Sequence, residues 1–566
     1  MTVENIADRV IKTDVLIVGG GIAGCPAAVR ARKHGLDVTI VEKADTRRSG
    51  SAAAGIDHFG ALMPADFSHL EEKYGKENVF RGEGFWDPVL GDTRFADANI
   101  QHVLSRYGEQ ILTDLEEMGV PMKWDDGDYY WIPTTRYRGE ALTMIRVHWE
   151  NVKPIMAKAV KDAGVNVLER TMVVDLLTSN GTVTGVTAVN TRTGEFIVIK
   201  AKSVVMATGL FARCYDPETP QFYKYKFRYH WCPATVSGDG WAIAYRAGGE
   251  LLNLDLPLWR FRERDDLTLS HGNFPHGDGL PAKQITWDGE EVLVDEGGYY
   301  RQLETEGRTP LYYTLETHPD DFHKRIEVAY IDERLLSFKI AEERGFDPRT
   351  HRYEQMPNKP HNFPFAGIST DETFESTSLK GLFAVGDCVN GLHGCGAATI
   401  SAFLVGDAMP DYINRIKDST IDEGQVTEQK ETALAPMKVK DGTEPMELES
   451  CIRYACDRYV GMFPSEGKLR EGIRRLGSLR RKFLPNLMAE NPHKLMRCLE
   501  VRNIMDLAEA HMHATLERKE TRFGYIRPDY PEMDKSRDNM LTFQRMENGK
   551  PVLEIKGIPD LKPEYA

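Results

Sequence analysis

The sequence has little that would place it in a membrane or on a nucleic acid. Its apolar runs, such as residues 14–18, are strand-sized and far short of the roughly 20 residues that span a bilayer. Residues 1–8 lack the basic and apolar regions of a signal peptide. Acidic residues (86) outnumber basic ones (71), whereas phosphate backbones and anionic lipids attract basic surfaces. We therefore expect a cytoplasmic protein with no nucleic-acid partner and no direct membrane insertion.

Clustered cysteines are also missing. The eight cysteines are scattered along 566 residues without a Cys-x-x-Cys pair. Iron-sulfur clusters and structural zinc sites depend on closely spaced thiolate ligands, and disulfide frameworks occur mainly in small secreted domains. We expect this chain to bind no metal and to contain no disulfide framework.

What the sequence does contain begins with a βαβ pattern. We predict an apolar strand at residues 13–18, a helix at 27–34 and a second strand at 37–41. The turn before the helix reads Gly19-Gly20-Gly21-Ile22-Ala23-Gly24, which fits G-x-G-x-x-G, and Glu42 closes the second strand. A glycine triplet alone indicates only a turn, but strand, helix and acid in this order predict a dinucleotide site.

Each residue of this pattern has a physical role. Gly19 permits the tight turn, Gly21 lets a pyrophosphate reach the backbone, and Gly24 lets the helix pack closely on the strand. The start of the helix offers partial positive charge to the pyrophosphate. Glu42 is expected to accept hydrogen bonds from the ribose hydroxyls.

The remaining chain divides into further parts. Period-two strands within 172–209, at 182–190 and 195–200 and ending in a stretch at 203–209, predict hairpin strands that return to the parallel sheet. The apolar stretch at 381–386 predicts a second return. Between them, a region rich in Trp, Tyr, Gly, Asp and Pro indicates an inserted domain. The predicted parts are the dinucleotide domain (1–240), the inserted domain (241–354), the return of the first domain (355–417), a polar connector without periodicity (418–445), and a helical C-terminal domain with a tail (446–566).

Three further segments identify the dinucleotide. Residues 204–209 and 382–387 resemble the two strands with which glutathione-reductase-type flavoproteins complete their FAD fold. Residues 47–55, Arg-Arg-Ser-Gly-Ser-Ala-Ala-Ala-Gly, resemble the signature of the succinate dehydrogenase and fumarate reductase flavoprotein superfamily, in which small side chains lie along the flavin. An NAD dehydrogenase would not need these segments.

This resemblance implies an α/β protein. It consists of a glutathione-reductase-like FAD-binding domain, an inserted α+β capping domain and a C-terminal helical domain. The residues that the resemblance places at the FAD are Gly19, Gly21, Ile22, Ala23, Gly24, Glu42, Lys43, Ser49, Gly50, Ser51, Val173, Ala207, Thr208, Gly209, Gly386, Asp387 and Thr399.

Within the superfamily, the chain resembles the alpha subunits of dissimilatory adenylylsulfate reductase over nearly its whole length. The segments at 493–500 and 515–522 are similar to the helical domain of those subunits. Three shorter segments resemble parts of their substrate pocket. They imply a pocket glutamate at Glu150, an aromatic wall at Trp231 and a substrate-binding arginine at Arg260.

The chemistry of a flavin reductase favours an arginine at this place. The guanidinium fork binds sulfate, phosphate or carboxylate through two contacts and keeps its proton at neutral pH. Arg260 is the first candidate, and its neighbours Arg262 and Arg264 are the alternatives. All three could instead pair with nearby acids on a solvated loop.

Two histidines complete the candidate site. His361 lies about one residue away from the superfamily's usual histidine and competes with Asn362 for that role as a proton donor or charge-stabilising contact. His393 is expected near the isoalloxazine. The asparagine that the family places after the small-residue path is missing here, because residues 56–60 read Ile-Asp-His-Phe-Gly.

The reaction implied by the resemblance is reduction of a small anionic substrate, adenylyl sulfate or a related compound, at flavin N5. One alternative is an enoate reductase of the fumarate type or a succinate-type dehydrogenase acting on a carboxylate. Another is an FAD relay subunit with no substrate of its own. Electrons are expected from a small ferredoxin-like iron-sulfur subunit, and the basic stretch at 468–482 either docks this partner or forms a solvated helix face.

Overall fold

The computed structural model is described here for a defined part of the chain. The described residues are 2–53, 55–56, 58–60, 95–107, 110–123, 127, 129–134, 141–147, 151–215, 233–257, 261–263, 283–292, 302–314, 316, 341–347, 350–357, 363, 365–392, 394–416, 420–461, 463–522 and 526–563.

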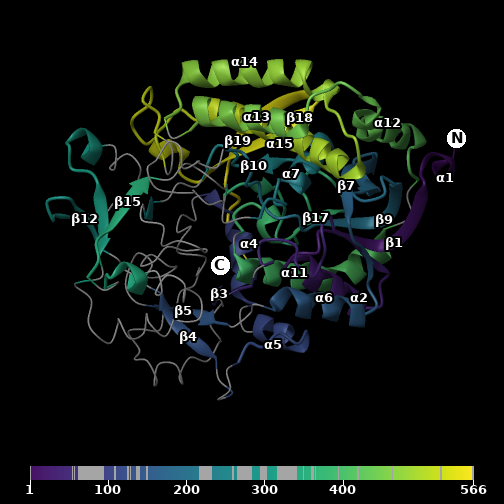
Figure 1. The fold of residues 1–566 in the computed structure, drawn as a ribbon. Coiled ribbons are helices and arrows are strands. Elements are labelled where there is room, and N and C mark those ends of the chain that lie inside the picture. The colour runs from purple at the N-terminus through teal and green to yellow at the C-terminus, as the bar shows by residue number, and fades with distance from the viewer. Residues whose placement is uncertain are drawn as a thin grey trace.

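A seven-stranded sheet lies between two groups of helices (Figure 1). Five strands run parallel in the order β6, β2, β1, β9 and β17. The strands of the sheet are β1 (Arg9–Val18), β2 (Val38–Val41), β6 (Asn166–Leu168), β7 (Thr171–Ser179), β8 (Thr182–Asn190), β9 (Phe196–Met206) and β17 (Leu382–Ala384). The chain first builds outward from β1 through β2 and β6, and then returns to the other side of β1 with β9. Ligands of open α/β sheets bind at such a switch point, here at the carboxyl ends of β1 and β9.

Strand β9 belongs to two pairings at once. Its first half pairs antiparallel with β8, which pairs antiparallel with β7, whereas its second half pairs parallel with β17. The sequence predicted two strands here, at 195–200 and 203–209. The structure joins them into one, and residues 201–206 continue the parallel pairing with β1. One long strand therefore links the hairpin to the dinucleotide site.

Helices cover both faces of this sheet (Figure 1). On one face lie α2 (Gly24–Lys33), α6 (Val152–Asp162) and α11 (Cys395–Arg415). Helix α11 crosses α2 so closely that a β-carbon added at Gly406 would lie 2.6 Å from the Arg30 Cβ and 3.0 Å from the Ala27 carbonyl oxygen. On the other face, α7 (Asp239–Arg246) packs between the sheet and the C-terminal helices.

Helix α7 spans the domain boundary predicted at residues 240/241. Its Trp241 side chain is fully buried, and the indole N–H donates to the Cys388 carbonyl at 3.2 Å. The helix therefore belongs to the core of the dinucleotide domain. From residue 261 on, five described strands form an antiparallel sheet. These strands are β11 (Phe261–Glu263), β12 (Lys283–Thr286), β13 (Glu291–Val292), β14 (Leu311–Thr314) and β15 (Tyr353–Pro357).

A second, smaller sheet is formed by strands from an earlier part of the chain. It is antiparallel in the order β3, β5 and β4, with bounds His58–Gly60, Ala141–Arg146 and Tyr130–Thr134. Among the residues described before residue 141, there are also three short helices, α1 (Val3–Ile6), α4 (Ala98–Ser105) and α5 (Gln110–Glu117).

The C-terminal part is helical, as the sequence predicts, but its end is not a loose tail. Helix α15 (Pro492–Glu517) is largely buried beneath α13 (Pro445–Tyr459) and α14 (Glu466–Lys482) (Figure 1). The chain then forms the hairpin of β18 (Met540–Glu547) and β19 (Lys550–Gly557). This hairpin joins β10 (Leu251–Leu252) and β16 (Gly367–Ile368) in a four-stranded sheet, so the last strands return to the dinucleotide domain.

The polar connector contains a regular helix, α12 (Glu423–Leu434). The Asp422 carboxylate caps its first turn by accepting from the amides of Gly424 and Gln425. Only Val426 and Ala433 are buried, and the helix holds β7 and β8 through polar contacts such as that from Gln429 to the Leu176 carbonyl, 2.8 Å long. The apolar stripe that would reveal a helix in the sequence is therefore missing. Among the described helices, none is long and apolar enough to cross a membrane.

Because Gly406 marks the closest crossing of α11 and α2, we predict that Gly406→Ala destabilises the protein. The added methyl group must displace the Arg30 stem or the helix backbone, and overpacking of this kind costs about 1–3 kcal/mol. The measurement is the free energy of unfolding from urea titration. Gly467→Ala is the control, since its β-carbon on the exposed start of α14 meets nothing within 4 Å. Equal stability of the two variants would contradict the tight crossing.

Candidate functional site

The glycine loop lies between the carboxyl ends of β1 and β9. Gly19 has a φ of +106°, and a β-carbon there would lie 2.5 Å from the Ala207 carbonyl oxygen. A β-carbon on Gly24 would lie 1.8 Å from the Gly19 carbonyl oxygen. These two glycines are required by the chain's own backbone. Gly21 is different, because its β-carbon would meet only the Ala207 carbonyl oxygen, at 3.9 Å. The space beside Gly21 is therefore open to a ligand.

The loop also presents unused donors. Among the described residues, no group accepts a hydrogen bond from the amides of Gly21, Ile22 or Ala23. These amides lie at the start of α2, where the partial positive charge of the helix favours an anion. Together with the open space beside Gly21, they fit a diphosphate.

Glu42 follows β2 and lies beneath the loop. Its Oε2 atom accepts from the Gly20 amide at 2.7 Å, and its Oε1 atom accepts from the Ala44 amide at 2.6 Å. Each carboxylate oxygen can accept a further hydrogen bond. The ribose contact expected of Glu42 stays a prediction.

The small-residue segment packs on top of this loop. The Ser49 hydroxyl donates to the Gly20 carbonyl at 3.3 Å. Gly50 has a φ of +77°, and a β-carbon there would lie 3.4 Å from the Gly21 Cα. Ser51, next in the chain, is exposed. Ser49 and Gly50 therefore lie against the glycine loop, as their place in the signature implies.

The ends of β9 and β17 meet at Cys388. The Cys388 Sγ accepts from the Thr208 amide at 3.1 Å and donates to the Gly209 carbonyl at 3.4 Å. Burial raises the pKa of the Cys388 thiol to about 11, so it stays protonated at neutral pH and keeps its proton for Gly209. The Thr208 hydroxyl in turn accepts from the Gly240 amide at 3.1 Å. Cys388 was missed by the sequence analysis, because no pattern predicts that a thiol will join two strand ends.

Gly386 brings the second return strand next to the glycine loop. It has a φ of +60°, and a β-carbon there would lie 3.1 Å from the Ala23 Cβ and 3.2 Å from the Ala398 Cβ. Val173 and Thr399 were also expected to contact the cofactor. Val173 is buried in β7, and the Thr399 hydroxyl lies 2.9 Å from the carbonyl of Cys395 in its own helix. Their cofactor contacts, and that of Asp387, stay predictions.

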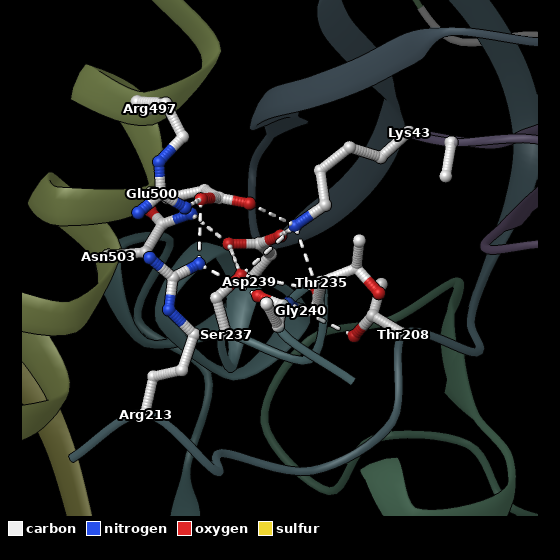
Figure 2. A network of polar contacts seen from close by, with 12 residues as sticks. Lys43, Thr208, Arg213, Thr235, Ser237, Asp239, Gly240, Arg497, Glu500 and Asn503 are labelled. Atoms are coloured by element: carbon white, nitrogen blue, oxygen red, sulfur yellow. Dashed lines mark hydrogen bonds and ion pairs between the residues drawn. The ribbon is translucent and has the colours of Figure 1, made fainter. Parts of the chain in front are cut away.

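The Lys43 side chain points into a buried polar network (Figure 2). Its ammonium lies 2.7 Å from an Asp239 oxygen and 2.7 Å from a Glu500 oxygen, and it donates to the Thr235 carbonyl and the Ser237 hydroxyl. Burial would lower the pKa of Lys43, but the carboxylates of Asp239 and Glu500 raise it above its ordinary value. The Lys43 side chain thus serves this network, and its contact with a cofactor stays a prediction.

The other half of the network reaches the C-terminal helices (Figure 2). Glu500 on α15 accepts from Lys43, from Arg497 and from Arg213, whose Nη1 lies 2.7 Å away. Arg213 also donates to Glu449 on α13 at 3.0 Å. Burial alone would raise the pKa of Glu500, but the three surrounding cations lower it to about 2. The network ties the segment after β2 to the helical domain through charges that are buried together.

The five residues expected to act on the substrate lie outside the described residues. They are Glu150, Trp231, Arg260, His361 and His393. Their roles therefore remain predictions. Within the described part of the chain, no group of three or more possible metal ligands gathers at one place.

Comparisons with known proteins agree on the cofactor. Residues 14–261 match the family described as an FAD binding domain, and residues 451–559 match the C-terminal family of fumarate reductase flavoproteins. The fumarate reductase flavoprotein subunit of Haemophilus influenzae is 24% identical over an alignment that covers 99% of this chain and 96% of the relative.

Solved structures share the fold. Adenylylsulfate reductase from Archaeoglobus fulgidus superposes with a TM-score of 0.77 and 23% identity, covering 98% of this chain and 96% of the other. A quinol fumarate reductase chain of E. coli superposes with a TM-score of 0.74 and 19% identity, covering 98% of each. These findings confirm the FAD cofactor and the fold class that the sequence predicts. The open space at Gly21 and the unused loop amides fit the diphosphate of FAD.

The contrast among the loop glycines gives a first prediction. Gly21→Ala should leave the apoprotein folded, because its β-carbon meets no atom closer than 3.9 Å. The same methyl group should block the diphosphate and weaken FAD binding by at least about tenfold. Titration of apoprotein with FAD and the melting temperature of the apoprotein measure the two effects. Gly24→Ala is the comparison, and loss of folding is expected there. Unchanged FAD affinity in Gly21→Ala would contradict the assignment of the loop.

Glu500 gives a second prediction. Glu500→Gln should destabilise the protein by roughly 3–5 kcal/mol near neutral pH, since it leaves buried cations without their counter-charge. The folded-state pKa of Glu500 is depressed, so its contribution is complete above 4.5 and is lost as the pH falls through about 2. The difference between wild type and variant in urea titrations should therefore shrink below pH 4.5. Glu447→Gln, on the exposed side of α13, is the control and should change little. A pH-independent difference would contradict the ionised state of Glu500.

Proposed function

Because the chain belongs to the FAD-dependent flavoprotein superfamily of fumarate reductase and succinate dehydrogenase, we propose that it reduces a small anionic substrate with an electron pair from bound FAD. The observation that carries this proposal is the meeting of four chain segments at the glycine loop. These segments are the loop after β1, the small residues at 49–50, the end of β9 and the start of the 386–388 turn.

The described residues have separate tasks in this proposal. The amides at the start of α2 bind the diphosphate, and Gly21 gives it access to the backbone. Cys388 holds the ends of β9 and β17 at a fixed spacing, so that main-chain groups line the cofactor. When bound, FAD supplies the two-electron chemistry.

Adenylyl sulfate is the first substrate that we propose. Its reduction takes two electrons, breaks the bond between sulfur and the bridging oxygen, and gives sulfite and AMP. Arg260 would neutralise the sulfate, Trp231 would stack near the adenine, and Glu150 would support the pocket. His361 would donate a proton or stabilise charge, and His393 would lie near the flavin ring. The sequence segments around Glu150, Trp231 and Arg260 support this choice, and the Archaeoglobus fulgidus adenylylsulfate reductase shares the fold.

A carboxylate is the second candidate substrate. The alignment with the Haemophilus influenzae fumarate reductase flavoprotein subunit covers 99% of this chain, which favours a fumarate- or succinate-type reaction. Arg260 would suit this substrate equally, because the guanidinium fork binds a carboxylate as it binds a sulfate.

Electrons are proposed to come from an iron-sulfur subunit, since the sequence has no clustered cysteines for a cluster of its own. The basic helix α14 was one possible docking site. Its outward arginines are largely engaged within the helix, as in the pair of Arg474 with Glu471 at 2.6 Å, and Arg480 binds Asp506 of α15 at 2.7 Å. These pairs favour a solvated helix face over a docking site.

The test is to reduce the purified flavoprotein with reduced viologen under anaerobic conditions and to follow the visible flavin absorption. Dithionite is avoided because it introduces sulfite. We expect adenylyl sulfate to restore the oxidised spectrum and fumarate to leave it unchanged. Reoxidation by fumarate alone would instead support the carboxylate reaction. If neither acts on a protein that contains flavin, the chain is a relay subunit and the proposal fails.

Variants test the arginine assignment in the same assay. Arg260→Gln should lower kcat/KM for the active substrate by about 10- to 100-fold, because it removes a charged hydrogen-bonding partner of the anion. Arg262→Gln and Arg264→Gln are the matched controls and should retain most of the activity. A larger loss in either control would move the role to that residue.

A further inference from the structure

Lys153 is a buried lysine that neither the sequence patterns nor the proposed reaction uses. It lies in the first turn of α6, and its side chain is 0% exposed. The ammonium donates to the Gly20 carbonyl of the glycine loop and lies 3.6 Å from the Cys25 Sγ. Lys153 follows Gly20 by 133 residues in the chain, so a residue from a distant helix lies directly beneath the FAD loop.

The chain provides no counter-charge in contact with this ammonium. Within the described part of the chain, no carboxylate lies within the 4.0 Å of an ion pair with Lys153. Its other neighbour, the Cys25 thiol, stays neutral because burial raises its pKa. A buried charge without a carboxylate in contact is costly, so an anion bound at this loop would stabilise the Lys153 ammonium. The diphosphate of FAD is an anion at the same loop.

The hydrogen bonds of Gly20 show how Lys153 acts on the loop. The Gly20 amide donates to Glu42, while its carbonyl accepts from Lys153, from Ser49 at 3.3 Å and from Cys25 at 3.2 Å. In a planar trans peptide, the carbonyl of one residue and the amide of the next point in opposite directions. With the Gly20 carbonyl held toward Lys153, the Gly21 amide points away from it. No described group accepts from that amide, and the space beside Gly21 is open.

We propose that Lys153 is the positioning residue of the FAD diphosphate site. Its ammonium fixes the Gly20–Gly21 peptide so that the Gly21 amide faces the diphosphate, and it supplies the positive charge that the bound anion balances from the other side of the loop. The inference rests on FAD binding and is independent of which substrate is reduced.

The test replaces Lys153 by methionine, which keeps the length of the side chain and removes its charge. FAD should bind the variant apoprotein about 10- to 100-fold more weakly, the effect of losing a charged hydrogen bond. The apoprotein should keep its melting temperature, because Ser49 and Cys25 still donate to the Gly20 carbonyl and an apolar side chain is tolerated at a buried site. Lys158→Met is the control, on the same helix but 75% exposed and paired with Asp162.

A second readout separates positioning from packing. ADP and adenosine are compared as competitors of FAD, because only ADP carries the diphosphate. The preference for ADP over adenosine should fall about tenfold in Lys153→Met, and Lys153→Arg, which keeps the charge, should retain it. A packing defect would weaken both competitors alike. If Lys153→Met does not fold, Lys153→Gln takes its place, since it keeps a donor without the charge.

The inference is overturned if the preference for ADP is unchanged in the uncharged variant, or if FAD affinity stays within about threefold of the wild type, a difference below 1 kcal/mol. A wild-type protein that binds no FAD would remove the proposed function as well. If the wild type binds FAD and Lys153→Met binds it with the same affinity, only the role of Lys153 is removed.

Discussion

The structure depends on close backbone contacts at the end of β1, where the glycine loop meets the start of α2 and the end of β9. Gly24 begins α2 against the carbonyl oxygen of Gly19, and Gly19 lies against the carbonyl oxygen of Ala207 at the end of β9. Side chains at these positions would separate the helix from the strand and β1 from β9. Only with both contacts in place does the loop bring its free amides to the switch point of the sheet, where a dinucleotide can bind.

A second constraint is the sharing of buried charges between the FAD domain and the C-terminal helices. Lys43 and Arg213 come from the first part of the chain, and Glu500 comes from α15 more than 280 residues later. Removing one of these groups leaves its partners as buried charges without a counter-charge, which lowers the free energy of unfolding. The network therefore holds the FAD domain and the C-terminal helices together. In the sheet of β10, β16, β18 and β19, strands from the C-terminal and FAD-binding parts of the chain are joined by backbone hydrogen bonds.

The predictions from sequence fail where a segment is held by polar contacts or by a partner far away in the chain. The strand β9 was divided in two at residues 201–202, although one continuous strand serves both pairings. Helix α12 was taken as a connector without periodicity because it contacts the sheet through glutamine side chains instead of an apolar stripe. The hairpin of β18 and β19 was taken as part of a helical domain and tail, since β18 pairs with residues 251–252, far away in the sequence.

The sequence by itself determined the FAD loop. The spacing of Gly19, Gly21 and Gly24 between a strand and a helix is a local pattern, and local geometry suffices to form it. The tertiary structure alone decided what surrounds the loop. Lys153 lies beneath Gly20, and Cys388 joins the strand ends, because a buried polar group must find its partner in space, wherever in the chain that partner stands. A local sequence pattern does not predict contacts between residues that lie far apart in the chain, because these contacts form only in the folded protein.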